Sequence, residues 1–170
     1  MTRTLILIRH AKSAWDDPLL ADHDRPLNDR GRQAAARIGA WMAVQGLAPD
    51  AALVSSAVRA QQTWAGVAGR LPAPPVAATV PGLYHAGPDV MMAVLQAARG
   101  DCVAVVGHNP GIAGFAAGLL ARPPRHTRFA DYPTGATLVA RFAVDDWAAL
   151  RFGTGEAVDF VVPRALPEAD

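Results

Sequence analysis

Two short apolar runs, Leu5–Ile8 and Cys102–Val106, constrain the fold of this 170-residue chain more than any other feature. Neither run alternates polar with apolar residues. Each therefore suits a strand that is covered on both faces, as in parallel sheets flanked by helices. Further strand-like segments are expected at 51–54, 76–80, 136–142 and 158–162, and the last two could pair in antiparallel fashion.

Helical patterns separate these strands. Asn28 is a good N-cap for a helix that Gly46 would end. Ser55 and Ser56 are expected to cap a second helix that runs to about Leu71, and further helices are expected over 87–98 and 110–120. This alternation predicts a three-layer α/β/α fold with a mostly parallel central sheet. At 170 residues we expect one domain, residues 1–170.

Composition excludes several classes of protein. Hydrophobic residues make up 51% and charged residues 18%, which is a globular balance, and the net charge of +1 gives no reason to expect nucleic acid or an anionic membrane as partner. No stretch approaches the roughly 20 apolar residues of a membrane span. The one cysteine, Cys102, reads as a core residue. We expect a cytoplasmic protein, with its oligomeric state open.

Polar and ionisable residues follow three of the expected strands, as Arg9-His10, the segment Ser55–Arg59, and Gly107-His108-Asn109. In parallel α/β sheets, ligands bind beyond the carboxyl ends of the strands. If the strands are neighbours, these groups therefore line one crevice.

The residue types in this crevice suit a phosphoryl group. A neutral imidazole such as that of His10 can accept it, and Arg9 and Arg59 can hold its oxygens by bidentate hydrogen bonds. His108, if protonated, can donate to another oxygen. Taken singly, each of these four residues can be explained without catalysis, as a salt-bridged, solvated or turn residue. Together they predict a cationic cradle for phosphoryl transfer.

Several sequence blocks resemble the histidine phosphatase superfamily, whose fold is phosphoglycerate-mutase-like, and within it the small phosphohistidine phosphatases of the SixA type. The blocks occur in the family's order. They are LILIRHAKS at 5–13, DRPLNDRG at 24–31, SSAVRAQQT at 55–63, LYHA at 83–86, VGHNPG at 106–111 and PTG at 133–135.

The resemblance implies a catalytic domain that needs no cofactor or metal. It makes His10 the phosphorylated nucleophile, Arg9 and Arg59 the phosphate ligands, and His108 the residue that completes the pocket. Arg25 matches a position that faces the same pocket. Ser13 and Asn109 are expected near the phosphate.

One departure from the family bears on the substrate. Many members carry a glutamate near the position of Tyr84 that protonates an alkoxide leaving group, whereas this chain has only Glu156 and Glu168. A phosphoramidate depends less on such an acid, because a protonated imidazole leaves as a neutral base. The expected substrate is therefore a phosphohistidine protein.

Four residues could act as the general acid in place of the missing glutamate. They are Asp22, Asp24, His85 and Asp89. If one of them does so, small phosphate monoesters are alternative substrates. A mutase is disfavoured, since its chemistry needs the acid.

Three further alternatives stay open. Zinc could be held by His10 and His108 with His23 or His85, although the spacing matches no helical metal motif. The chain could bind phosphate without catalysis. The arginines of 122–128 could form a docking surface for an acidic partner, or simply a solvated loop.

Overall fold

The computed structural model describes all of residues 1–170. Strands and helices alternate through most of the chain. In order they are β1 (Arg3–Arg9), α1 (Asp29–Val44), β2 (Ala51–Ser55), α2 (Val58–Ala68), β3 (Ala77–Val80), α3 (Pro88–Gln96), β4 (Cys102–Gly107), α4 (Gly111–Leu119), β5 (Thr137–Phe142) and β6 (Glu156–Val161).

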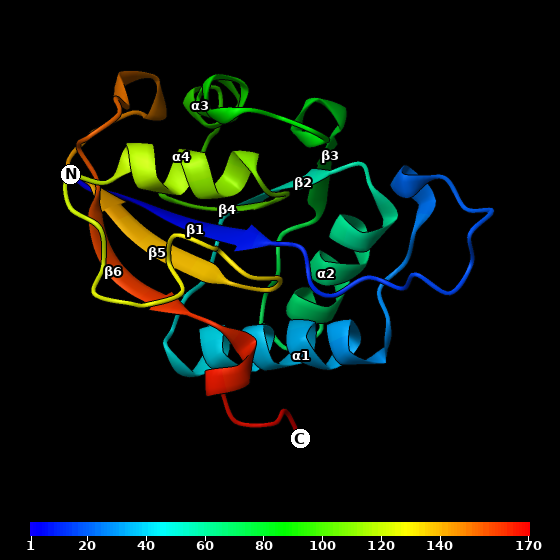
Figure 1. Ribbon diagram of the computed structural model, residues 1–170. Coiled ribbons are helices and arrows are strands. Elements are labelled where there is room, and N and C mark those ends of the chain that lie inside the picture. The colour runs from blue at the N-terminus through cyan, green and yellow to red at the C-terminus, as the bar shows by residue number, and fades with distance from the viewer.

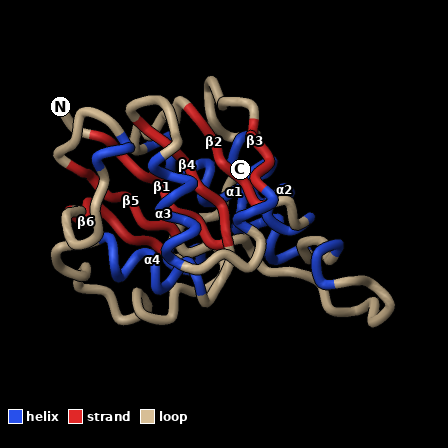
Figure 2. Tube along the Cα trace, turned by 90° about the horizontal axis from the view of Figure 1, so that it is seen from above, coloured by secondary structure: helices blue, strands red, loops and turns tan.

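The strands form one sheet in the order β3-β2-β4-β1-β5-β6. The first four are mutually parallel, and β5 and β6 are antiparallel to their neighbours. Helices α3 and α4 lie on one side of the sheet and α1 and α2 on the other (Figure 1). Seen from above, the strands run through the middle of the molecule (Figure 2). The predicted three-layer α/β/α fold is confirmed, with an antiparallel edge that makes the sheet mixed.

Burial on both faces explains the apolar run of β1. Leu5 and Leu7 pack into the core under α3 and α4, whereas Ile6 and Ile8 belong to the core cluster that contains residues of α1 and α2. All four side chains are fully buried. Burying each such side chain contributes about 1.5–3 kcal/mol. The two core layers therefore hold β1, and the residues at its end, in place from both sides.

Local signals place most of the helix ends. The Asn28 side chain accepts a hydrogen bond from the Gly31 backbone N–H at 2.8 Å, as expected of an N-cap. Gly46, with φ +69°, ends the same helix region in the left-handed conformation that glycine adopts without strain.

The prediction for α2 was wrong at both ends. The helix begins at Val58 with Ala57 as an N-cap that lacks a side-chain hydrogen bond, and it ends at Ala68. Ser55 is the last residue of β2, and its hydroxyl faces His108 instead.

Cys102 is only partly buried, yet burial and the nearby Asp50 charge raise the pKa of its thiol to about 11. That thiol is therefore unreactive at neutral pH.

The segment between β1 and α1 extends beyond the body of the molecule in both ribbon views (Figures 1 and 2). It returns through a bridge between Ser13 and Leu27. Gly31 then passes so close to the segment that a Cβ atom would lie 2.0 Å from the Lys12 carbonyl oxygen. Only glycine allows this approach, which fixes the returning segment over the strand ends.

None of the helices has the length and apolar character needed to cross a membrane.

Candidate active site

The three predicted groups lie at one edge of the sheet because β2, β4 and β1 are parallel neighbours. A cavity of about 680 Å³ opens there. Its lining includes all seven residues expected at the site: Arg9, His10, Ser13, Arg25, Arg59, His108 and Asn109.

The hydrogen bond of the His10 ring leaves its Nε2 without a hydrogen. Its Nδ1 lies 2.7 Å from the Ala11 carbonyl oxygen, which can only accept, so Nδ1 carries the hydrogen and Nε2 the lone pair. Burial, and then the charges of Arg59, Arg9 and Arg25, lower the pKa of His10 to about 4. At neutral pH the ring is therefore uncharged and nucleophilic.

Two backbone contacts hold the His10 segment. Thr63 Oγ1 accepts a hydrogen bond from the Ala11 N–H at 2.9 Å and donates to the Arg59 carbonyl at 2.7 Å. The backbone N–H of His10 donates to the Gly107 carbonyl oxygen. His10 is thus tied to both α2 and β4, and the role of Thr63 was not predicted from the sequence. Its place four residues after Arg59, on the same face of α2, is the signal that could have identified it.

Three arginines surround His10. Arg25 and Arg59 are buried, and Arg9 donates to the Tyr132 carbonyl oxygen at 3.0 Å. The Nε atom of each has no hydrogen-bond partner within the protein. Three guanidinium groups around one cavity provide the charge and the directed donors that a phosphoryl dianion requires.

His108 lies opposite His10, with the two ring centroids 5.1 Å apart. Its Nε2 is 2.7 Å from Ser55 Oγ, and its Nδ1 has no partner within the protein. Burial, and then the neighbouring His10 and Arg59, lower the pKa of His108 to about 3. His108 is therefore neutral at pH 7 in this structure, and it can still donate one N–H to a phosphoryl oxygen.

Asp22 reaches into the arginine cluster from a short 3-10 turn, Asp22–Asp24. Its carboxylate accepts hydrogen bonds from Tyr84 Oη at 2.5 Å, Arg25 at 2.6 Å and Arg59 at 2.9 Å. These three contacts, Tyr84 first, hold the pKa of Asp22 well below its usual range. Asp22 is therefore an anion at neutral pH and cannot donate a proton as a general acid.

Replacing Asp22 by Asn should tighten the binding of vanadate and inorganic phosphate. The carboxylate, 45% exposed, occupies donors of Arg25 and Arg59 and repels an incoming anion. We expect the inhibition constant to fall about three- to tenfold, as removal of ~1 kcal/mol of repulsion implies.

The matched control is Asp24→Asn, because Asp24 pairs only with His23 at 3.4 Å. Weaker anion binding by the Asp22 variant would show that Asp22 chiefly positions the arginines.

Two of the expected residues make contacts that hold the walls of the cavity. Ser13 accepts a hydrogen bond from Arg25. Asn109 donates to the carbonyl oxygens of Asp131 at 2.8 Å and Tyr132 at 3.1 Å, which joins the turn after β4 to the loop before β5.

The remaining candidates are dispersed. Asp24 and Asp89 do not line the cavity, and His23 bonds with Ser56 outside it. His85 lines the cavity and stacks on Tyr84 with ring centroids 3.9 Å apart. No group of three or more His, Cys, Asp or Glu side chains is placed to hold a metal ion.

Trp15 is 77% exposed, and the Arg25 guanidinium lies over its ring at 3.6 Å. This cation–π contact places Trp15 at the mouth of the cavity.

Comparisons with known proteins identify the class to which this fold and site belong. Residues 5–83 match the histidine phosphatase superfamily (branch 1). An uncharacterized protein of Mycobacterium tuberculosis is 37% identical over 165 residues, which cover 92% of this chain and all of that protein. This chain belongs to the histidine phosphatase superfamily.

Solved structures place the chain near the SixA-like branch. A structure from Nakamurella multipartitia, a candidate phosphohistidine phosphatase SixA, is 29% identical. It superposes with a TM-score of 0.82 over 97% of this chain and 98% of its own. A mycobacterial glucosyl-3-phosphoglycerate phosphatase shares the fold at 17% identity, with a TM-score of 0.60 over 93% of this chain and 98% of its own.

Proposed function

We propose that residues 1–170 form one catalytic domain that dephosphorylates phosphohistidine in proteins without a metal ion. In the first step, Nε2 of His10 attacks the phosphorus in line. A P–N bond forms to His10, the P–N bond of the substrate breaks, and its electron pair returns to the departing imidazole. Arg9, Arg59 and His108 hold the three equatorial oxygens, on which negative charge accumulates.

In the second step, water attacks the phosphorus of phosphorylated His10. The P–N bond breaks, its electron pair returns to Nε2, and inorganic phosphate leaves. A histidine held uncharged is suited to both steps, since it is a nucleophile in the first and a neutral leaving group in the second.

The observation that carries this proposal is that both carboxyl groups lining the cavity are in ion pairs with arginines. The lining includes two carboxylates and no glutamate. Asp22 is held ionised by Tyr84, Arg25 and Arg59, and Asp131 pairs with Arg128 at 3.1 Å. A phosphoramidate can be cleaved in such a pocket, whereas an alkyl phosphate lacks the acid that typically contributes about 10²–10⁴-fold to its cleavage.

A small-metabolite phosphomonoesterase is the second candidate. His85 lines the cavity and could protonate an alkoxide. The glucosyl-3-phosphoglycerate phosphatase with the same fold supports this alternative. It predicts that His85→Ala lowers the rate with esters and leaves the rate with phosphohistidine nearly unchanged.

The experiment compares phosphate release from a phosphohistidine-bearing protein and from a panel of monoesters, with a metal chelator present. We expect turnover of phosphohistidine to be faster by at least about 10²-fold, the smallest contribution usual for the missing acid. Faster turnover of any ester would overturn the substrate class, and loss of activity with the chelator would overturn metal independence.

A further inference from the structure

A second hollow, of about 440 Å³, adjoins the catalytic cavity. The two share four lining residues: Lys12, Arg128, Pro133 and Thr134. We call this hollow the basic groove. Its lining residues are Lys12, Arg30, Gln33, Ala34, Arg37, Arg128, Pro133, Thr134, Val162, Pro163 and Arg164. The catalytic cavity and the groove are therefore neighbours, so residues that flank a phosphorylated side chain bound at His10 are within reach of the groove.

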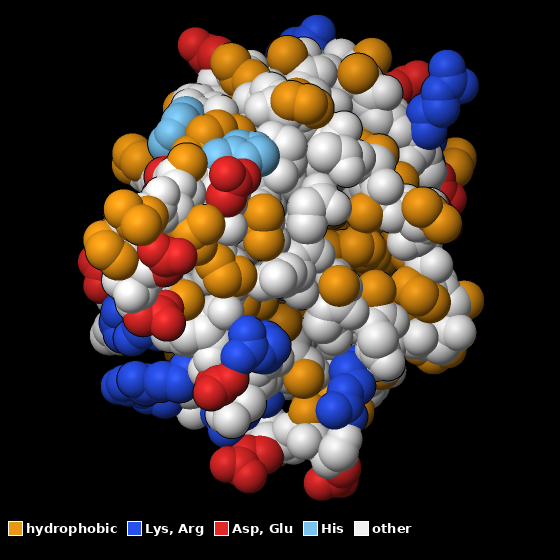
Figure 3. Space-filling model, turned by 90° about the vertical axis from the view of Figure 1, so that its right-hand side faces the viewer, with side chains coloured by type: hydrophobic (Ala, Val, Ile, Leu, Met, Phe, Trp, Pro, Cys, Tyr) orange, Lys and Arg blue, Asp and Glu red, His pale blue; other side chains and the backbone are white.

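The groove concentrates positive charge in a nearly neutral protein. Five of its lining residues are cationic and none is acidic, although the whole chain has 16 basic and 15 acidic residues. Arg37 pairs with the exposed Glu168, and Arg128 pairs with Asp131. The other three cations, Lys12, Arg30 and Arg164, form no ion pair. On the face shown in Figure 3, most Lys and Arg side chains lie in the lower half, at the level of α1.

The framework of the groove is fixed. Arg30, Gln33 and Arg37 share one face of α1 by their i, i+3, i+7 spacing. The opposite wall is anchored by Val161 and Leu166, which pack against the core cluster under α1. A Cβ atom on Gly135 would lie 2.6 Å from the Pro163 ring, so the loop before β5 packs directly against that wall.

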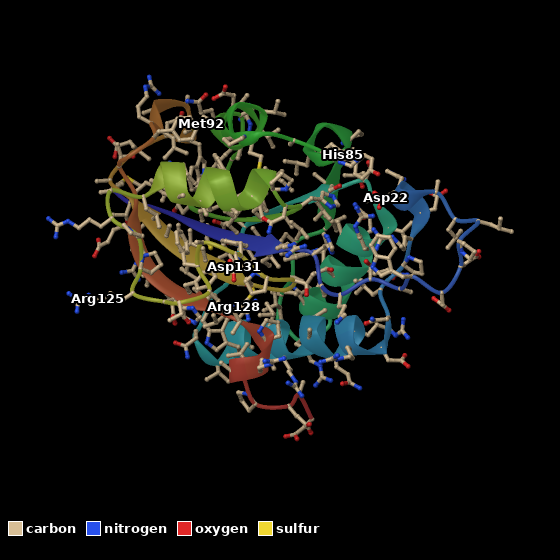
Figure 4. All side chains as sticks on the ribbon, in the orientation of Figure 1. Asp22, His85, Met92, Arg125, Arg128 and Asp131 are labelled. Atoms are coloured by element: carbon tan, nitrogen blue, oxygen red, sulfur yellow. The ribbon has the colours of Figure 1, made fainter.

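The arginines of the 122–128 loop lie in different parts of the surface. In Figure 4, Arg125 points away from the body of the molecule, whereas Arg128 lies beside Asp131. Arg122 and Arg125 line another hollow together with Glu156 and Asp159, where charges of both signs balance. Of the arginines in this loop, only Arg128 lines the basic groove. The structure therefore favours the groove, rather than the 122–128 loop, as a docking surface.

The groove suits several spaced carboxylates better than one phosphate group. In the catalytic cavity, buried guanidinium groups converge on one point, whereas Arg30 and Arg164 are exposed and come from segments on opposite walls. Uncharged Pro133, Val162 and Pro163 line the same groove. An extended polypeptide with acidic side chains matches this combination of separated charges and uncharged surface.

We propose that the basic groove binds acidic residues that flank the phosphorylated histidine of a protein substrate. The proposal rests on the proposed function, because it adds a recognition site to the same reaction. Distributed charge contacts of this kind lower KM and depend on ionic strength, while the chemical step at His10 stays the same.

The kinetic test uses the double variant R30Q/R164Q, whose substitutions lie outside the catalytic cavity. Substrates are free phosphohistidine and two phosphohistidine peptides, one with Asp and Glu flanks and one with Ser and Gln flanks. For the wild type we expect a higher kcat/KM with the acidic peptide, and for the variant about a tenfold loss, mostly in KM, with that peptide alone. Arg99→Gln, at an exposed arginine three residues beyond the end of α3, is the control.

A binding measurement keeps the two proposals distinguishable. Fluorescence anisotropy with a labelled, unphosphorylated acidic peptide should show binding that R30Q/R164Q and added salt both weaken about tenfold. If monoesters prove to be the better substrates while this binding persists, the proposed function is wrong, and the proposal that the groove binds acidic residues is still supported. No preference between the two peptides, or equal binding by wild type and R30Q/R164Q, would overturn the groove proposal.

Discussion

Replacing His10 by Ala should abolish phosphatase activity with every substrate. The loss is expected to be about 10⁴-fold or more, as for other enzymes that lose a covalent nucleophile. The domain should stay folded, because the ring makes only one polar side-chain contact, with the Ala11 carbonyl. Far-UV circular dichroism and the melting temperature check the fold. A variant with near-wild-type turnover would refute the assignment of the nucleophile.

The same substitution identifies the His10 signal in a histidine NMR titration. Burial and three arginine charges lower the pKa of His10 to about 4, so its ring should titrate near pH 4 and stay unprotonated from there upward. The nucleophile is then available throughout the neutral range. A midpoint near 6.5, the value of an exposed histidine, would contradict the pocket electrostatics described here.

Replacing Arg59 by Ala should lower kcat/KM by roughly 10²–10³-fold, the usual cost of removing one preorganised donor to a transition-state oxyanion. Vanadate binding should weaken as well, since Arg59 supplies a buried guanidinium beside His10. Steady-state kinetics and vanadate inhibition measure both effects.

Arg59→Lys separates charge from geometry. It keeps the positive charge and loses the planar pair of donors, so we expect an intermediate loss. Unchanged vanadate affinity in Arg59→Ala would remove Arg59 from the phosphate site.

The features that could be predicted from the sequence depend on local chemistry. Leu5–Ile8 and Cys102–Val106 read as buried strands because both faces are apolar, and β1 and β4 are indeed neighbours in the sheet. His10 and His108 could then be placed together, since each directly follows one of these strands. Parallel neighbouring strands bring both residues to the same edge.

What could not be predicted depends on contacts between distant segments. Ser55 was expected to cap α2, yet its hydroxyl lies against His108, 53 residues away. Asp22 was a candidate acid until its contacts with Tyr84 and Arg59, 62 and 37 residues away, fixed its charge. No periodicity within one segment encodes such pairs. The basic groove is a similar case, because it joins residues of α1 to the chain after β6.

Trapping the phosphoryl group that His10 carries transiently would show the proposed intermediate itself. A phosphohistidine peptide would be mixed with the enzyme, quenched in alkali within milliseconds, and the enzyme digested for mass spectrometry. We predict phosphate on the peptide that contains His10, stable in alkali, lost in acid, and absent from His10→Ala. A phosphoryl group on any other residue, or turnover with no phosphoenzyme under conditions that preserve phosphohistidine, would contradict the account.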